Sequence, residues 1–260
     1  MSRKPHVLIP LPDTDFDPTE SATPWRVCMD RGWTATFATE HGKVAAADHR
    51  LLMGFVRGPL GAGPMGLRDY KRMIATPEYQ TPIRYDQINV DDYDAILLTG
   101  GHAPGMKQFL ESKVLQEKIV GFFNRNKGIG AICHGLLPLA RAIDPETGKS
   151  VLYDYKTTSL TKILEQIGYA STFWLLGRRF RTYDAYVEDE TRAALKGPRQ
   201  YSSGWLFVPH VVVDRNLVTS RYWLFDIVSY SVKFAEMVEQ RQTPFWDGVS
   251  EHDGSERFSS

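Results

Sequence analysis

Two continuous apolar runs dominate the middle of the sequence, and a segment with a helical pattern separates them. The runs are residues 93–98 and 128–133, and the segment between them, 105–124, has the length of a helix. A short, uninterrupted apolar run is typical of a strand that is buried on both faces of a parallel sheet. The chain is therefore expected to fold as an α/β protein in which helices cover both faces of the sheet.

The same alternation extends over most of the chain. Further strands are expected at 6–11, 33–38, 151–158, 207–213 and 217–220. Further helices are expected at 20–30, 67–74, 160–167, 187–195 and 224–239. Strands that alternate with helices in this way predict a mostly parallel sheet.

The charge balance and the apolar runs exclude several classes of partner. Lys and Arg together number 31, as do Asp and Glu, so an excess of positive charge that would attract nucleic acid is absent. No apolar run approaches the roughly 20 residues that span a bilayer. The first apolar stretch, Val7 to Ile9, is too short for the core of a signal peptide, and two cysteines cannot build a disulfide framework. We expect a cytoplasmic protein with neither nucleic acid nor membrane as a partner.

Cys133 is the first candidate for chemistry. It ends an apolar strand where a helix begins at once, and Gly130 and Gly135 flank it, as in a nucleophile elbow. The positive end of the helix dipole favours the thiolate, so we expect an exposed, ionised thiol. The alternative is a buried, inert cysteine. Cys28, on the inward stripe of the first helix, is expected to be such a core residue.

A second loop follows the preceding strand. It reads Thr99-Gly100-Gly101-His102, and paired glycines at a strand end let backbone N–H groups approach a ligand closely, as an oxyanion hole requires. An ordinary turn is the alternative explanation of these two glycines.

Together these segments resemble the DJ-1/PfpI superfamily, a branch of the class I glutamine-amidotransferase-like fold, which is flavodoxin-like. The similarity extends over roughly residues 7–239. The segments that carry it are Ala131-Ile132-Cys133-His134-Gly135, Leu97-Leu98-Thr99-Gly100-Gly101-His102, Glu20 before Pro24-Trp25, residues 37–42 and residues 216–221.

The resemblance implies a role for each of these residues. Cys133 would be the nucleophile, and Glu20 would hydrogen-bond its sulfur and shuttle a proton. The backbone N–H groups of Gly101 and His134 would stabilise an oxyanion. His134 would belong to the catalytic set, although a histidine that faces a neighbouring subunit or strand is an equal alternative. The loop of Gly100, Gly101 and His102 would bind the substrate.

The sequence also departs from the superfamily pattern after the elbow helix. Some members place a histidine there and others an acid, but Ser159 occupies the expected histidine position. Asp154 is a candidate acid whose register is uncertain, so the expected site is Cys133 with Glu20. His6, His41 and His49 lack the spacing of metal ligands, so a zinc site is not expected there. The glyoxalase III-like reaction that the resemblance implies requires neither a metal nor an organic cofactor.

Three functions remain open at this point. The first is a glyoxalase III-like enzyme that converts a 2-oxoaldehyde into a 2-hydroxy acid through Cys133 and Glu20. The second is a hydrolase, hydratase or lyase that acts on an amide, an isocyanide or a specialised metabolite. The third is a redox or stress-sensing or chaperone-type protein without turnover, in which an exposed thiol is oxidised.

One domain accounts for the pattern over residues 1–240. It is expected to carry an insertion at about 43–92, where glycine and proline interrupt the periodicity, and a second elaboration at about 170–205. Residues 241–260 form a polar C-terminal tail. Relatives in the superfamily imply a small-molecule substrate and a possible homodimer.

Overall fold

A seven-stranded sheet forms the centre of the protein. The computed structural model describes residues 3–53 and 61–242. The strand order is β10-β11-β7-β6-β1-β3-β5, and all neighbouring strands are parallel except β10 and β11. The strands are β1 (His6–Pro10), β3 (Thr34–Thr39), β5 (Ile83–Arg84), β6 (Ala95–Leu98), β7 (Gly128–Ile132), β10 (Val211–Asp214) and β11 (Leu217–Ser220). The predicted mostly parallel, flavodoxin-like sheet is confirmed.

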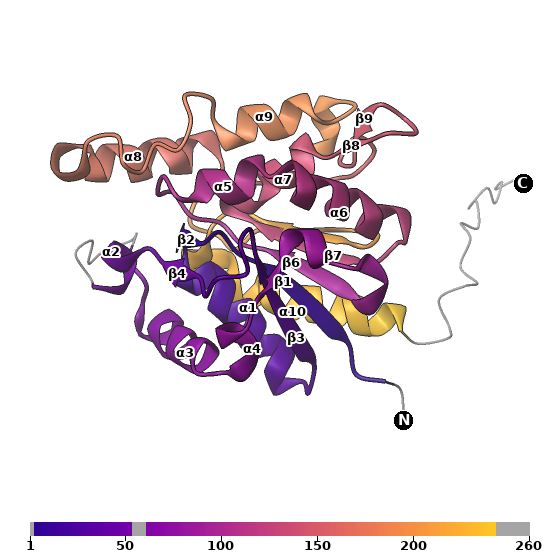
Figure 1. Ribbon diagram of the computed structural model, residues 1–260. Helices are drawn as coiled ribbons and strands as arrows, with labels where there is room; N and C mark the ends of the chain where they lie inside the picture. The colour runs from indigo at the N-terminus through magenta and orange to yellow at the C-terminus, as the bar shows by residue number, and fades with distance from the viewer. Residues whose placement is uncertain (1–2, 54–60, 243–260) are drawn as a thin grey trace, which may run out of the picture.

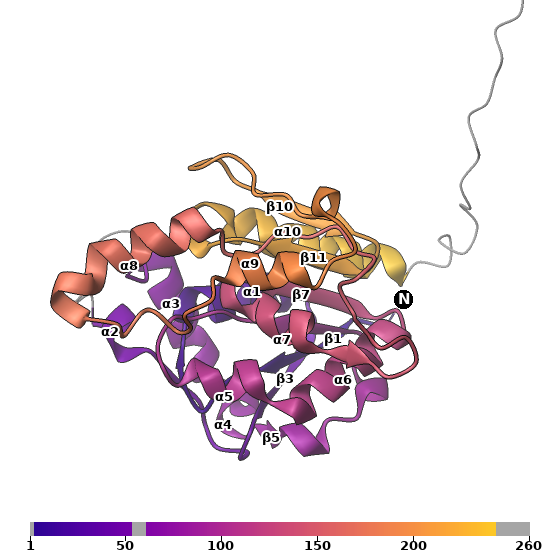
Figure 2. The same ribbon diagram turned by 90° about the horizontal axis from the view of Figure 1, so that it is seen from above.

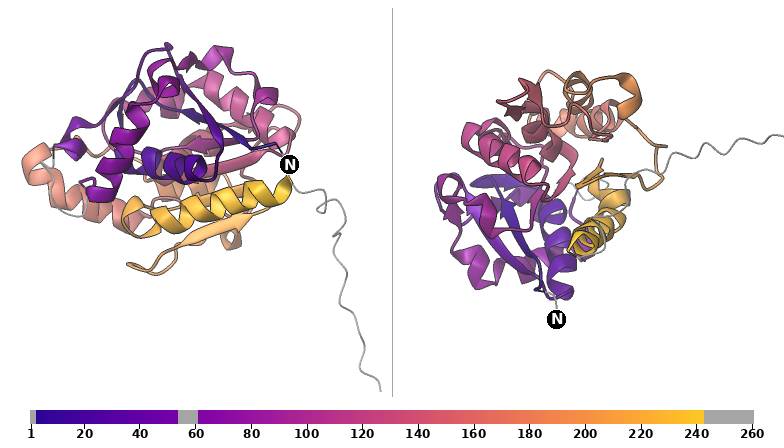
Figure 3. Two further views of the ribbon diagram at one scale, coloured as in Figure 1. Left: turned by 90° about the horizontal axis from the view of Figure 1, so that it is seen from below. Right: turned by 90° about the vertical axis from the view of Figure 1, so that its right-hand side faces the viewer.

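Helices cover both faces of this sheet (Figure 1). The central strands β6 and β7 are therefore buried along their whole length, which agrees with their continuous apolar sequence. On one face α1 (Pro18–Asp30) and α10 (Trp223–Arg241) lie side by side, and α3 (Pro64–Ile74) packs on the outside of α1 (Figure 3). The other face carries α5 (Met106–Glu111), α6 (Lys113–Asn124) and α7 (Leu136–Arg141).

A further layer lies outside α7. It consists of α8 (Lys162–Leu176) and α9 (Val187–Ala193), which pack against each other and, through α9, against α7 (Figure 2). The remaining elements are short. They are β2 (Thr14–Phe16) paired with β4 (Ala46–Ala47), β8 (Ile143–Asp144) paired with β9 (Lys149–Ser150), α2 (His49–Leu52), α4 (Pro77–Gln80), and the 3₁₀ turns η1 (Tyr85–Gln87), η2 (Val90–Asp92), η3 (Cys133–Gly135) and η4 (Pro198–Gln200).

Two of the expected elements were wrong. The helix expected over 105–124 is two helices, because the backbone of Ser112 is extended and its side chain caps α6 by accepting a hydrogen bond from the N–H of Leu115. The strand expected over 151–158 is a series of turns in which only Thr157 forms an isolated bridge, to Tyr201. The β-prone residues there pack by side-chain contacts instead, since the hydroxyl of Thr219 accepts a hydrogen bond from the N–H of Thr158.

The other boundaries moved by a few residues. The helix expected over 160–167 continues to Leu176, and the strand expected over 207–213 starts only at Val211. The division into one domain with elaborations at 43–92 and 170–205 stays a prediction. Residues 54–60 of the insertion and residues 243–260 of the expected tail lie outside the described residues. None of the helices in the described part of the chain combines the length and apolarity that crossing a lipid bilayer requires.

The contact between β7 and α10 is tight enough to test by one substitution. A Cβ atom added at Gly130 would lie 2.7 Å from Phe234 Cδ2, 2.7 Å from Tyr230 Oη and 2.8 Å from Leu97 Cδ2. Gly130→Ala should therefore lower the free energy of unfolding, measured by urea denaturation, by about 1–3 kcal/mol through overpacking. Gly197→Ala is the matched control, because that extended glycine faces open space and its change should stay within about 0.5 kcal/mol. Equal stability of the two variants would contradict this description of the packing.

Candidate active site

The predicted site residues gather at the carboxyl edge of the parallel sheet. Cys133 follows β7, the loop from Thr99 to His102 follows β6, and the segment that leads into α1 follows β1. Because β1, β6 and β7 are parallel neighbours, these three connections meet at one edge. Ligands of open α/β sheets bind at this edge.

The backbone of Cys133 is left-handed, with φ of +57°. A residue other than glycine adopts this conformation at a cost of about 1–3 kcal/mol, and it persists only where the surroundings enforce it. Gly135 is one such constraint. A Cβ atom there would lie 2.5 Å from the carbonyl oxygen of Leu98 and 2.7 Å from that of Thr99, so only glycine lets η3 approach the end of β6 this closely. The sharp strand-to-helix turn predicted from the sequence is present.

Glu20 reaches the elbow from the first turn of α1. Asp17 caps this helix, since its carboxylate accepts hydrogen bonds from the N–H groups of Thr19 (2.7 Å) and Glu20 (3.0 Å). The N–H of Asp17 donates to the carbonyl of Gly100 at 2.9 Å, which ties the start of α1 to the glycine loop. Glu20 is only 2% exposed.

Gly100 lies against both Glu20 and Cys133. A Cβ atom at this position would lie 2.2 Å from Glu20 Oε2, 2.7 Å from Cys133 Cβ and 3.1 Å from the backbone nitrogen of His134. The absence of a side chain at Gly100 is therefore what allows Glu20 and Cys133 to be neighbours. This explains why the loop needs a glycine here, beyond the turn itself.

The expectation of an exposed, ionised thiol was wrong for this conformation. Cys133 has 0% exposed surface, and burial raises the pKa of its thiol well above the usual value. The negative charge of Glu20 raises this pKa further, whereas the hydrogen bond from the N–H of His134 lowers it. The helix dipole is weak because only a 3₁₀ turn and the six-residue α7 follow. The proton therefore rests on sulfur.

The hydrogen bonds of Thr182 determine the tautomer of His134. The single hydroxyl proton of Thr182 goes to the carbonyl of His102 at 2.9 Å. The same oxygen lies 3.4 Å from His134 Nε2, so Nε2 must carry the hydrogen and donate it. Burial lowers the pKa of His134 well below its usual value, so the ring is neutral. Nδ1 then has a free lone pair, and it lies 3.5 Å from Cys133 Sγ, where it can accept the S–H.

His102 completes the polar group around the sulfur. Its ring meets that of His134 edge to face at 4.8 Å between centroids, and burial lowers its pKa to about 4. One nitrogen from each of these rings and the sulfur of Cys133 lie within 4.8 Å of one another. The sequence placed all three residues in the candidate site but not in one group of possible metal ligands, because His102 follows β6 whereas Cys133 and His134 follow β7. The role of Gly101 in an oxyanion hole stays a prediction; its φ is +155°.

The segment that follows α8 closes the site, which the sequence did not predict. Phe180 packs against Leu51 and Ala103 and lies 6.1 Å from the ring of His102. Arg179 Nη2 lies 3.4 Å from Asp15 and 3.8 Å from Asp48, which fastens the segment to the loops around β2 and α2. Neither Phe180 nor Arg179 belongs to a recognisable motif. The signal in the sequence is weak: the segment follows α8, a helix with few apolar residues that face the core.

The two candidates for a third catalytic residue point elsewhere. Asp154 is exposed and pairs with Lys196 at 3.7 Å. The Ser159 hydroxyl is buried and lies 3.0 Å from that of Tyr201. The geometry therefore does not bring either of them to Cys133.

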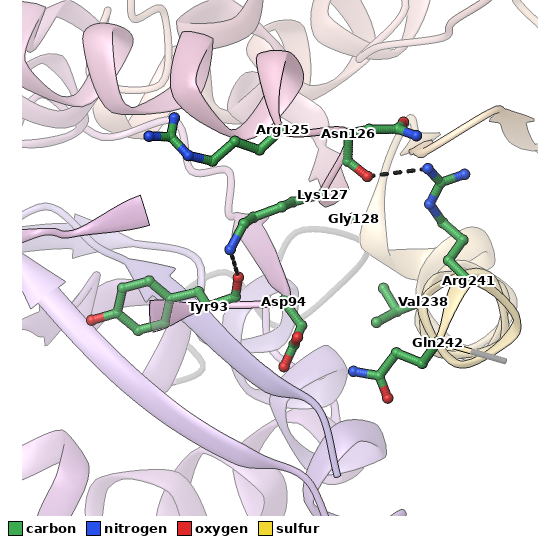
Figure 4. Close-up of a pocket in the computed structure, with 9 residues that line it drawn as sticks. All are labelled: Tyr93, Asp94, Arg125, Asn126, Lys127, Gly128, Val238, Arg241 and Gln242. Carbon is green, nitrogen blue, oxygen red and sulfur yellow. Dashed lines mark hydrogen bonds between the residues drawn. The ribbon is translucent and has the colours of Figure 1, made fainter. Parts of the chain in front are cut away.

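The opposite edge of the sheet carries a separate pocket of about 390 Å³ (Figure 4). Tyr93 and Asp94 line it just before β6, and residues 125–128 line it at the start of β7. Lys127 Nζ donates to the carbonyls of Val90 and Tyr93, so backbone oxygens hold its charge. This pocket lies at the amino ends of the strands, away from the cysteine.

Comparisons with known proteins agree with this geometry. A family model described as ThiJ/PfpI family-like matches residues 11–202, well over half of the chain. An uncharacterized protein of Schizosaccharomyces pombe is 32% identical over 118 residues, which are 45% of this chain and 44% of that protein. Glyoxalase 3 of Candida albicans is 23% identical over 148 residues, 57% of this chain and 61% of that protein. The chain thus matches less than two thirds of the length of either relative.

A solved structure shares the fold over nearly the whole chain. The crystal structure of glyoxalase III from Candida albicans superposes with a TM-score of 0.66 at 20% sequence identity, covering 92% of this chain and 98% of that one. At this level of identity the likeness establishes the fold alone.

The neutral state of His102 predicts how stability depends on pH. Its pKa is about 4 in the folded protein and about 6.5 in an unfolded chain, so below pH 6.5 the unfolded chain binds a proton that the folded protein does not. The stability that this group contributes above pH 6.5 is lost as the pH falls toward 4. Between these values the free energy of unfolding of the wild type should fall faster than that of His102→Gln, by up to about 1 kcal/mol per pH unit.

Urea unfolding at several pH values measures this difference. His49→Gln, which changes an exposed histidine, is the control and should lose stability as steeply as the wild type. Parallel curves for the wild type and His102→Gln would contradict the assigned neutral state.

Proposed function

Because the chain belongs to the ThiJ/PfpI family, we propose that it is a cofactor-free enzyme that converts a small 2-oxoaldehyde into a 2-hydroxy acid, with Cys133 as nucleophile and Glu20 as proton shuttle. The observation that carries the proposal is that the Glu20 carboxyl group and the side chain of Cys133 both border the space that a side chain at Gly100 would fill. The matched relative named glyoxalase 3 supports the same chemistry.

The first step is addition of the thiol to the aldehyde. The sulfur forms a bond to the aldehyde carbon, and the S–H proton passes through Nδ1 of His134 to the aldehyde oxygen, which gives a hemithioacetal. The 3.5 Å separation of Nδ1 from Sγ and the free lone pair of Nδ1 support this path. The backbone N–H groups of Gly101 and His134 are the proposed donors to the oxygen while it carries negative charge.

Glu20 then moves a proton between adjacent carbons. With the resting proton on sulfur, the neighbouring Glu20 carboxylate can remove the hydrogen of the former aldehyde carbon as a proton. It returns this proton to the adjacent ketone carbon, while the hydroxyl proton of the hemithioacetal moves to the former ketone oxygen, and the product is a thioester of the 2-hydroxy acid. Water hydrolyses the thioester and restores the thiol, so the balance is one 2-oxoaldehyde and one water to one 2-hydroxy acid.

Burial suits this sequence of steps. A closed site strengthens the electrostatic attraction between an oxyanion and its N–H donors, and it keeps water away from the intermediate until the thioester forms. The cytoplasmic location, which was expected from the composition, stays a prediction. The homodimer, which the superfamily implies, also stays a prediction.

Replacement of Cys133 tests the nucleophile. Cys133→Ala should lower kcat/KM for methylglyoxal and phenylglyoxal by about 10³-fold or more, because no covalent intermediate can form. Lactate formation from methylglyoxal measures the activity. Cys28→Ala is the matched control, since this second cysteine is buried in the core, and it should retain turnover. Turnover by Cys133→Ala equal to the wild type would overturn the proposal.

A small panel of amides in the same assay distinguishes the alternative reaction. Hydrolysis of an amide without conversion of either glyoxal would make the protein a hydrolase that uses the same thiol. If neither class of substrate reacts with the wild type, the proposed activity is rejected.

Replacement of Glu20 tests the proton shuttle. Glu20→Gln keeps the size of the side chain but removes the base, so kcat for methylglyoxal should fall by about 10²–10⁴-fold. Glu117→Gln, on the exposed surface of α6, should leave kcat unchanged. A Glu20→Gln enzyme with wild-type kcat would show that another group transfers the proton.

A further inference from the structure

Cys133, His134 and His102 place three different metal-binding atoms around one point. Each residue offers one such atom, the sulfur or a ring nitrogen, and the three atoms lie within 4.8 Å of one another. Thiolate and imidazole are the ligands that zinc and related thiophilic cations prefer. Cys133 and His134 are fully buried and His102 is partly buried.

The separations suit a tetrahedral ion. Sulfur at about 2.3 Å and nitrogen at about 2.0–2.1 Å from zinc stand about 3.5 Å apart in tetrahedral geometry. Cys133 Sγ and His134 Nδ1 are already 3.5 Å apart. The ligand atom of His102 lies within 4.8 Å of both of these atoms, so a small movement of its ring would bring in the third ligand.

A neighbouring hydrogen bond orients one of the ligands. The Nε2–H of His134 donates to Thr182, so the lone pair of Nδ1 points to the ion. Metal-binding histidines are usually fixed in this way by a partner on the other ring nitrogen. The carboxyl group of Glu20 borders the same space beside Gly100 as the side chain of Cys133.

We propose that His102, Cys133 and His134 form a binding site for a thiophilic divalent cation of the zinc class. Binding forms a bond between the cation and sulfur and releases the thiol proton to solvent. The fourth ligand position remains for water. The cation occupies the sulfur that the substrate needs, so it acts as an inhibitor; this consequence alone rests on the proposed function.

Cobalt(II) is the probe for this site, because a bond from cobalt to thiolate gives a near-ultraviolet charge-transfer band. Reduced full-length protein is titrated with Co²⁺ under exclusion of oxygen, and Zn²⁺ is then added to displace it. We expect about one ion per chain, a charge-transfer band, and displacement by zinc. Cys133→Ala should abolish the band, and His102→Gln should weaken Co²⁺ binding at least about tenfold.

Two controls show that a loss of binding is local. Cys28→Ala and His49→Gln should bind Co²⁺ as the wild type does, and urea unfolding checks that each variant is folded. If His102→Gln does not fold, Thr182→Val replaces it, because that variant keeps all three ligands and removes only the partner of Nε2; we expect about tenfold weaker binding.

Three results would overturn the site. They are the absence of a charge-transfer band in the wild type, a band that survives in Cys133→Ala, and unchanged affinity in the folded variant of His102 or Thr182. Because the readout is absorbance, each result stands whether or not the protein turns over a glyoxal.

Discussion

The left-handed backbone of Cys133 is the constraint on which the rest of the site depends. With φ of +57°, it turns the chain from β7 into η3 within one residue and directs the side chain toward the carboxyl edge of the sheet. The strain persists because the neighbouring elements leave no alternative. Gly135 lies against the end of β6, and Gly100 leaves space for two acidic groups of different kinds, a thiol and a carboxyl.

Burial gives this arrangement its chemical character. In water a thiol beside a carboxylate would exchange protons with solvent, but the covered site makes a second negative charge costly. Burial raises the pKa of the Cys133 thiol well above its usual value and the charge of Glu20 raises it further, so the sulfur keeps its proton at rest. In the proposed mechanism this proton leaves through Nδ1 of His134, which the hydrogen bonds of Thr182 keep free.

The sequence predicted the parts of the fold that have a strong local pattern. The strands ending at Leu98 and Ile132 and the helix carrying Glu20 were found because continuous apolar runs and a helical stripe are local signals. The break at Ser112 was missed, because a capping serine inside an apolar helical stretch looks like any surface serine. The expected strand near Thr157 failed because tertiary contacts override β propensity.

The chemistry of the site was less accessible to sequence reasoning. The residues of the elbow and the glycine loop could be named, but the exposure and ionisation of Cys133 could not, because they depend on Phe180 and Thr182 from a distant segment. A motif describes neighbours along the chain, whereas a pKa depends on neighbours in space. The grouping of His102 with His134 was hidden for the same reason.

The most direct test of the account is to observe the bond between sulfur and substrate. On exposure to methylglyoxal, the native intact mass of the Glu20→Gln protein should increase by one methylglyoxal more than that of the Glu20→Gln/Cys133→Ala protein, because addition occurs but the proton transfer does not. Equal mass increases in the two proteins would contradict the central claim that Cys133 is the nucleophile.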